Sequence, residues 1–275
     1  MGGAGLLRAV HQGEGATQAQ ANRPLLRIDQ VSKRFDNDIT AIAEASLSIR
    51  PGEFVSLLGP SGCGKSTLLA LVAGLTAPTT GRIDWPQSTY DAGGAPERSI
   101  GFVFQEPTLL PWRTVYNNVY LPLKLAGVSR AAAHAQVTDG LAQVGLTGFE
   151  KAYPRQLSGG MKMRVSIARA LIKQPKILLM DEPFAALDEI TRGHLSRELL
   201  QVFIARNLTV IFVTHSVYES VFLANRIVVM TKRPGRIHAD IPIEAPYPRS
   251  EDYRMSVAYN DYCRRVSALL SEAMD

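Results

Sequence analysis

The sequence predicts an α/β fold in which a mostly parallel β-sheet core carries an antiparallel β subdomain and an inserted helical subdomain. Short apolar runs of strand length alternate with helix-length segments of three- and four-residue periodicity over the second half of the chain. Two alternating segments joined by a turn precede this region, and residues 107–154 carry helical periodicity alone. A chain of 275 residues with 46% hydrophobic content can bury a core of this size.

The predicted elements follow from local patterns taken in order along the chain. Residues 1–23 are rich in Gly, Ala and Gln and predict a disordered tail. Strands are expected over 25–35, 40–49, 54–58, 81–85, 99–104, 177–180, 209–213, 227–230 and 237–243. Helices are expected over 66–73, 115–125, 130–144, 161–173, 189–206 and 217–224, with a loop at 91–94 and a terminal helix from about residue 251.

Composition and charge restrict the function classes. The net charge is +5 and the pI is near 9.3, but Lys and Arg are scattered without a run of five or more, which favours a solvated basic surface over a nucleic-acid site. Cys63 and Cys263 are far apart and give neither a disulfide framework nor a metal-binding spacing, so a reducing cytosol fits best. No window of eighteen apolar residues occurs, so no segment is expected to span a membrane.

One loop predicts nucleotide binding. It matches the phosphate-binding pattern G-x-x-x-x-G-K-[ST] and consists of Gly59, Pro60, Ser61, Gly62, Cys63, Gly64, Lys65, Ser66 and Thr67. Its backbone N–H groups can converge on a phosphate, Lys65 adds a positive charge, and the Ser66 hydroxyl can ligate Mg²⁺. The alternative is a Gly-rich turn, but an apolar strand before the loop and a helix after it place the anion at a helix N-terminus. We also expect alkylation of Cys63 to block hydrolysis, with MgATP protecting.

Polar residues follow three other predicted strands, at Gln105, Asp181-Glu182 and His215. The carboxyl ends of parallel strands meet at one sheet edge, so these side chains can converge on one phosphate. Asp181 is placed to hold Mg²⁺ and Glu182 to polarise an attacking water, although the pair could instead cap the next helix, with Pro183 in its first turn. His215 could contact the γ-phosphate directly or orient the water and Glu182, and Gln105 could ligate the metal or sense the nucleotide.

Six motifs, in their order along the chain, resemble those of the ATP-binding subunit of an ABC transporter. They are the phosphate loop, Gln105, Leu157-Ser158-Gly159-Gly160-Met161, residues 177–183, Ala186-Leu187-Asp188 and Thr214-His215. The Leu-Ser-Gly-Gly signature is the most diagnostic, because other P-loop families lack it before their acidic strand. The resemblance covers roughly residues 25–240. It implies a P-loop (RecA-like) fold, ATP and Mg²⁺ as cofactors, and ATP hydrolysis.

The resemblance also implies a homodimer. Two chains would meet head to tail, so that Ser158, Gly159 and Gly160 of each close on the γ-phosphate held by the other, with Asp188 at the seam and Phe35 stacked on adenine. Ser158 suits a helix N-cap and the glycines permit close backbone approach, although an ordinary capped amphipathic helix is the alternative. Met161 stands where the family usually has Gln, which changes a side-chain contact but no backbone contact.

The resemblance divides the chain into a tail over 1–23, an ABC ATPase domain over 24–240 and a C-terminal helical extension over 241–275. The helical subdomain would cover about 106–156 plus the signature helix to about 173. The Pro-stiffened apolar segment 107–112 would line the groove that receives a permease helix, with Trp112 as an interface anchor, whereas packing of this segment in the core is the alternative.

The resemblance therefore implies the ATPase subunit of an importer. Three segments look most like the nitrate, sulfonate and taurine branch: Leu109-Leu110-Pro111-Trp112, Leu-Ser-Gly-Gly-Met and Thr231-Lys232-Arg233-Pro234-Gly235-Arg236-Ile237. Its expected partners are a second copy, transmembrane permease subunits and, indirectly, a periplasmic solute-binding protein. Its expected location is the cytoplasmic face of the inner membrane, as a peripheral protein. A soluble ABC-type ATPase acting on nucleic acid or ribosomes is the alternative, but the chain lacks the second cassette, coiled coil or zinc modules typical of that class.

Overall fold

The computed structural model of the protein describes residues 23–36, 38–89, 96 and 98–274. The tail predicted over 1–23 therefore lies outside the described residues, apart from Arg23. The loop predicted at 91–94 also lies outside them.

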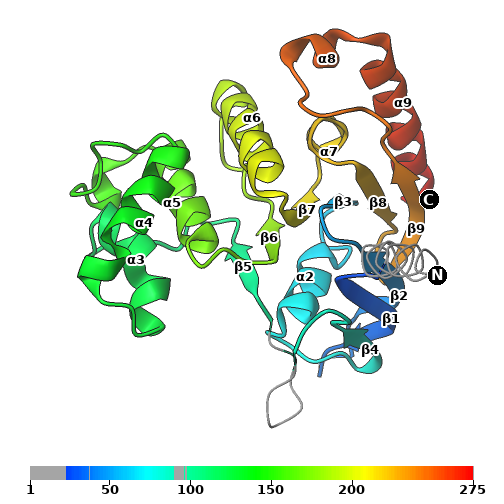
Figure 1. The fold of residues 1–275 in the computed structure, drawn as a ribbon. Coiled ribbons are helices and arrows are strands. Elements are labelled where there is room, and N and C mark those ends of the chain that lie inside the picture. The colour runs from blue at the N-terminus through cyan, green and yellow to red at the C-terminus, as the bar shows by residue number, and fades with distance from the viewer. Residues whose placement is uncertain (1–22, 37, 90–95, 97, 275) are drawn as a thin grey trace, which may run out of the picture.

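A nine-stranded mixed sheet, in the order β4-β1-β2-β9-β8-β3-β7-β6-β5, organises the fold (Figure 1). The neighbouring strands β8, β3, β7, β6 and β5 pair with one another in parallel. β1 pairs antiparallel with β2 and with β4. These pairings confirm the predicted fold class. The strands are β1 (Leu26–Arg34), β2 (Thr40–Ile49), β3 (Phe54–Leu58), β4 (Thr80–Asp84), β5 (Ile100–Val103), β6 (Ile177–Asp181), β7 (Thr209–Thr214), β8 (Arg226–Met230) and β9 (Gly235–Pro242).

The strand β9 joins the two kinds of pairing. It pairs in parallel with β2 and antiparallel with β8, so the antiparallel strands and the parallel strands form one continuous sheet. β9 begins at Gly235, two residues before the predicted start. Arg236 is already paired there, because its backbone oxygen accepts a hydrogen bond from Thr231 N at 3.0 Å across the β8–β9 turn.

Helices cover both faces of the central strands. Every residue of β3 and β7 is buried, which explains why both read as continuous apolar runs. Phe54 of β3 packs edge-on against Phe203 of α6, with ring centroids 5.1 Å apart. The helices are α2 (Lys65–Ala73), α3 (Val115–Leu125), α4 (Arg130–Gln143), α5 (Gly159–Leu171), α6 (Glu189–Arg206), α7 (Val217–Leu223), α8 (Glu251–Met255) and α9 (Val257–Glu272), with a 3-10 turn η1 at Pro154–Gln156.

The helical insertion lies between β5 and β6 in the sequence. Figure 1 shows α3, α4 and α5 grouped at the β5 end of the sheet. The helix predicted over 161–173 begins earlier, at Gly159, because the Ser158 side chain caps it by accepting a hydrogen bond from Met161 N. In the part of the chain that the structure describes, no helix has both the length and the apolar character needed to cross a bilayer.

The single terminal helix predicted from about residue 251 is wrong, because two helices occupy this region. Ser256 has an extended backbone, ends α8 and begins α9. Its hydroxyl accepts a hydrogen bond from Tyr259 N at 3.1 Å, which compensates the free N–H group of the new helix.

Polar side chains from two helices hold the loop that follows β5. Asn118 of α3 is fully buried; its amide donates to the backbone oxygens of Leu110, Arg113 and Thr114 and accepts from Leu110 N at 2.8 Å. Arg169 of α5 donates to the backbone oxygens of Pro107 and Thr108, each at 2.9 Å. The loop between Gln105 and α3 is therefore a fixed structure, tied to both helices.

We predict that Asn118→Ala destabilises the protein measurably. The substitution leaves several loop groups without their partner, and each such hydrogen bond contributes about 1 kcal/mol net. We therefore expect the free energy of unfolding, measured by urea denaturation, to fall by about 2–3 kcal/mol. Asn117→Ala is the matched control, because the Asn117 side chain only accepts from Arg130 at 3.2 Å. Equal losses in the two variants would contradict the assignment.

Candidate functional site

The phosphate loop connects β3 to α2 in a conformation that requires glycine. Gly64 has φ +105°, and a Cβ there would lie 2.8 Å from Ala41 O. Gly62 also has a positive φ, of +76°. α2 begins at Lys65, within the phosphate-binding pattern, so the free N–H groups of its first turn face the site.

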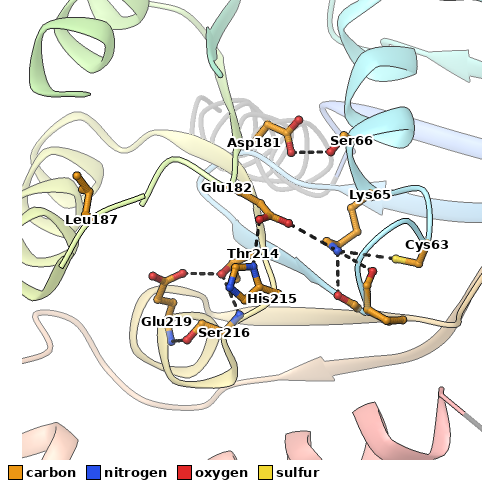
Figure 2. Close-up of polar contacts among 12 residues, drawn as sticks. Cys63, Lys65, Ser66, Asp181, Glu182, Leu187, Thr214, His215, Ser216 and Glu219 are labelled. Atoms are coloured by element: carbon orange, nitrogen blue, oxygen red, sulfur yellow. Dashed lines mark hydrogen bonds and ion pairs between the residues drawn. The ribbon is translucent and has the colours of Figure 1, made fainter. Parts of the chain in front are cut away.

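Lys65 is the buried cation of this site, with its side chain 4% exposed. Its Nζ donates to Gly59 O at 2.9 Å and to Pro60 O at 3.0 Å, and it lies 3.9 Å from Glu182 Oε1 (Figure 2). The loop carbonyls thus hold the ammonium group inside the loop. Its charge can act on a phosphate in a place where water screens it weakly.

Ser66 and Asp181 form the pair best suited to a metal ion. Ser66 Oγ donates to Asp181 Oδ1 at 2.8 Å. Burial raises the pKa of Asp181, whereas the hydrogen bond from Ser66 and the charge of Lys65 lower it. Both groups supply the hard oxygen ligands that Mg²⁺ prefers. Among the described residues no group of three His, Cys, Asp or Glu lies close enough to hold a metal ion.

Glu182 lies between a cation and an imidazole. Its Oε1 is 3.9 Å from Lys65 Nζ, and its Oε2 is 3.0 Å from His215 Nδ1 (Figure 2). Its backbone is left-handed, with φ 44°, an uncommon state for a residue other than glycine. The alternative that Asp181 and Glu182 cap the next helix is wrong, because α6 begins at Glu189 and Asp188 is its N-cap.

A buried polar network behind His215 was not anticipated from the sequence. Thr214 Oγ1 donates to Glu219 Oε2 at 2.5 Å, and Arg192 Nε of α6 lies 3.5 Å from Glu219 Oε1. Burial raises the pKa of Glu219, while Thr214 and Arg192 lower it. Ser216 and Glu219 show the spacing of a capping box, which could have revealed that Glu219 sits at the start of α7.

One cavity is lined by half of the predicted site residues, and Asp181 and His215 are not among them. It has a volume of about 480 Å³. It is lined by Phe35, Ile39, Ala41, Ser61, Gly62, Gly64, Lys65, Ser66, Thr67, Gln105, Glu182 and Arg233. Phe35 leaves 42% of its surface exposed, so its ring is available for stacking. Of the lining residues, Ile39, Ala41 and Arg233 were not predicted, because no phosphate-binding pattern includes them.

The signature residues lie outside this cavity. Ser158, Gly159, Gly160 and Asp188 do not line it. Asp188 Oδ1 accepts from Thr191 N at 2.9 Å, and hydrogen bonds from the start of α6 lower its pKa. Gly160 is buried, and a Cβ there would lie 2.7 Å from Thr191 Cγ2, so packing of α5 on α6 also requires this glycine.

Two further sequence interpretations depend on how far a side chain is buried. Trp112 is 71% exposed, so the alternative that places Trp112 in the core is wrong. Cys63 is only 1% exposed, and burial raises the pKa of its thiol despite the nearby charge of Lys65. Both features argue against the expected reactivity of Cys63, because alkylation needs an accessible thiolate.

We predict slow alkylation of Cys63 in the folded protein. Iodoacetamide at pH 7.5 should modify Cys63 at least about ten times more slowly in the native chain than in urea, since both access and thiolate fraction are low. Peptide mass spectrometry measures the rate at each cysteine, and Cys263, also buried, is the internal comparison. Rapid labelling of Cys63 in the native protein would contradict this prediction if it also caused a loss of ATPase activity that the Cys63→Ser variant does not show.

Comparison with known proteins identifies the family. Residues 42–185 match the model of the ABC transporter family. The chain is 46% identical over 211 residues to an aliphatic sulfonates import ATP-binding protein, SsuB, of Bacillus licheniformis, covering 77% of this chain and 80% of that protein. It is 43% identical over 250 residues to an uncharacterized ABC transporter ATP-binding protein of Methanocaldococcus jannaschii, covering 90% and 91% of the two chains.

Solved structures agree with this family. CbiO1 from Clostridium perfringens, part of the ABC transporter complex cbiONQ, superposes with a TM-score of 0.73 at 26% identity, covering 90% of this chain and 99% of that chain. The dimeric ATP-binding cassette MJ0796, in a post-hydrolysis state bound to ADP and Pi, gives a TM-score of 0.68 at 32% identity, covering 80% and 100%. The chain therefore belongs to the ABC transporter family, as an ATP-binding protein whose characteristic activity is ATP hydrolysis.

Proposed function

We propose that the protein is the ATP-hydrolysing subunit of an ABC importer and couples ATP binding, dimer closure and hydrolysis to solute transport through a separate permease. One observation carries the proposal: the cavity is lined by part of the phosphate loop, by Gln105 and by Glu182, but not by the signature residues. Ser158 lies at the exposed N-terminus of α5, where a helix dipole favours an anion that its own chain does not supply. A second copy placed head to tail supplies that anion.

Within each site the residues take separate roles. Lys65 and the loop N–H groups would bind the phosphates. Ser66 and Asp181, whose Oγ and Oδ1 atoms are 2.8 Å apart, would hold Mg²⁺ together with Gln105. Glu182 accepts a proton from the attacking water, and His215, at 3.0 Å, orients the carboxylate of Glu182. Phe35 stacks on the adenine, and Ser158, Gly159, Gly160 and Asp188 act across the dimer seam.

A groove beside the loop after β5 is the proposed docking place for the permease. It has a volume of about 440 Å³ and is lined by residues that include Phe104, Leu110, Leu121 and Arg169. Phe104 is 40% exposed and stacks on Phe102 with centroids 4.3 Å apart, so the groove has an apolar floor open to a partner. Arg169 joins this loop to α5, the helix that the signature residues begin.

The relatives support an importer of a small anion. The SsuB relatives carry the name of aliphatic sulfonate import proteins, and CbiO1 is part of a transporter complex. We assign the protein to the cytoplasmic face of the inner membrane, as a peripheral subunit served by a periplasmic solute-binding protein, with nitrate, sulfonate, taurine or a related anion as solute. Uptake by the whole complex in liposomes tests this function. ATPase activity that rises with DNA, RNA or ribosomes, without a membrane partner, would favour the soluble alternative.

We predict that Glu182→Gln keeps ATP binding but lowers the hydrolysis rate on the order of 100-fold or more, because the amide cannot accept the proton. The variant should accumulate as a dimer with two bound ATP molecules, measured by size-exclusion chromatography and nucleotide analysis. Glu44→Gln, at an exposed carboxylate of β2, is the control and should hydrolyse at the native rate. Native-rate hydrolysis by Glu182→Gln would remove Glu182 from the base role.

We predict that Trp112→Ala uncouples ATP hydrolysis from transport. The isolated variant should bind and hydrolyse ATP normally, since Trp112 does not line the nucleotide cavity. Reconstituted with its permease, it should lose about tenfold or more of solute uptake, as expected when an aromatic interface anchor is removed. Met255→Ala, which removes another exposed apolar side chain, is the control. Unchanged uptake by Trp112→Ala would contradict the docking role.

A further inference from the structure

A basic residue of the β8–β9 turn reaches the nucleotide cavity from a part of the chain far from the phosphate loop in sequence. Arg233 lines the cavity together with Phe35, Gly62 and Lys65. Its Nε donates to Gly62 O, within the phosphate loop, at 3.1 Å. None of the motifs that predict ATP binding includes Arg233.

The turn approaches the phosphate loop closely enough to fix the position of Arg233. A Cβ on Gly235 would lie 2.1 Å from Cys63 O, and a Cβ on Gly59 would lie 3.0 Å from Met230 O. The residues that flank the turn therefore pack directly against the start and the middle of the phosphate loop. Thr231 Oγ1 accepts from Arg236 N at 3.0 Å and closes the turn from inside.

The C-terminal helix holds the same turn from its other side. Lys232 N donates to Ala273 O at 3.1 Å, and Lys232 Nζ donates to Met274 O at 2.9 Å. Ala273 is buried, so this end of α9 is itself anchored. The turn is thus held between α9 and the phosphate loop, and Arg233 is the side chain that it presents to the cavity.

The charge of Arg233 is available to a ligand. Among the described residues no carboxylate forms an ion pair with it, and its one recorded hydrogen bond uses Nε alone. Its two terminal amino groups therefore keep four N–H donors. A guanidinium with free donors beside a phosphate-binding loop matches a polyphosphate in both charge and geometry.

We propose that Arg233 is a nucleotide-binding residue that recognises the phosphate groups of ATP and ADP, held in place by the end of α9. The proposal rests on ATP binding, which family membership supplies, and not on import. It also gives the C-terminal extension a role, because Lys232 ties α9 to the turn that carries Arg233.

Arg233→Gln tests the proposal, with dissociation constants of ATP, ADP and adenosine measured by isothermal titration calorimetry. We expect the dissociation constants of ATP and ADP to rise about five- to tenfold, which is the loss of affinity expected when one partly exposed charge contact is removed. The dissociation constant of adenosine should stay unchanged. The difference should shrink at high salt, because Arg233 is exposed. Arg233→Lys should recover part of the affinity.

Arg236→Gln is the matched control. Arg236 lies in the same hairpin but faces Glu44, with 3.9 Å between the charged atoms, and should leave all three constants unchanged. Unchanged ATP affinity in Arg233→Gln, or equal weakening for adenosine, would overturn the proposal and leave Arg233 as a support of the loop. Failure of the wild-type chain to bind ATP would instead contradict the ATPase function itself.

A truncation after Glu272 tests the role of α9. It removes both carbonyl acceptors of Lys232, so ATP affinity should fall in the wild-type background and fall no further in Arg233→Gln. Thermal unfolding of each variant verifies that it is folded. Additive losses in the double variant, or no loss on truncation, would overturn the link between α9 and Arg233.

Discussion

Parallel pairing in register is the constraint on which the site depends. Leu58 of β3 pairs with Thr214 of β7, and Val213 of β7 pairs with Asp181 of β6, so three strands end at nearly the same level. The polar residues that follow each strand therefore lie at the same edge of the sheet. A slip of one residue in either pair would turn Asp181 to the opposite face and separate it from Ser66. Every residue of β3 and β7 is buried, so a slip would misplace packed side chains on both faces of the sheet.

Glu182 shows what the site requires beyond the sheet. Its left-handed backbone costs on the order of 1–3 kcal/mol, and the surrounding hydrogen bonds maintain it: Glu182 N donates to Val213 O at 3.0 Å and Ala185 N donates to Glu182 O. The turn at this residue directs the carboxylate toward Lys65 and His215 (Figure 2). The strain therefore lies at the residue that faces both the cation and the imidazole.

Most of the fold could be predicted because each element carries its own local signal. Burial on both faces makes β3, β6 and β7 apolar runs, and caps such as Ser158 mark helix starts. The break at Ser256 could not be predicted in this way, since helical periodicity continues through it. Glu219 and Arg233 were missed because their importance comes from contacts between segments distant in sequence. The burial of Cys63 likewise depends on tertiary packing around the loop.

The separation of the signature residues from the nucleotide cavity has a further consequence. If two chains must meet to complete a site, the hydrolysis rate of the free subunit depends on how often copies collide, and dilute subunits consume little ATP. Two subunits held on one permease would instead meet at the high effective concentration of tethered partners. If the proposed function holds, the position of Ser158 and Gly160 outside the cavity thus limits ATP hydrolysis to the assembled transporter, and no separate inhibitor is needed.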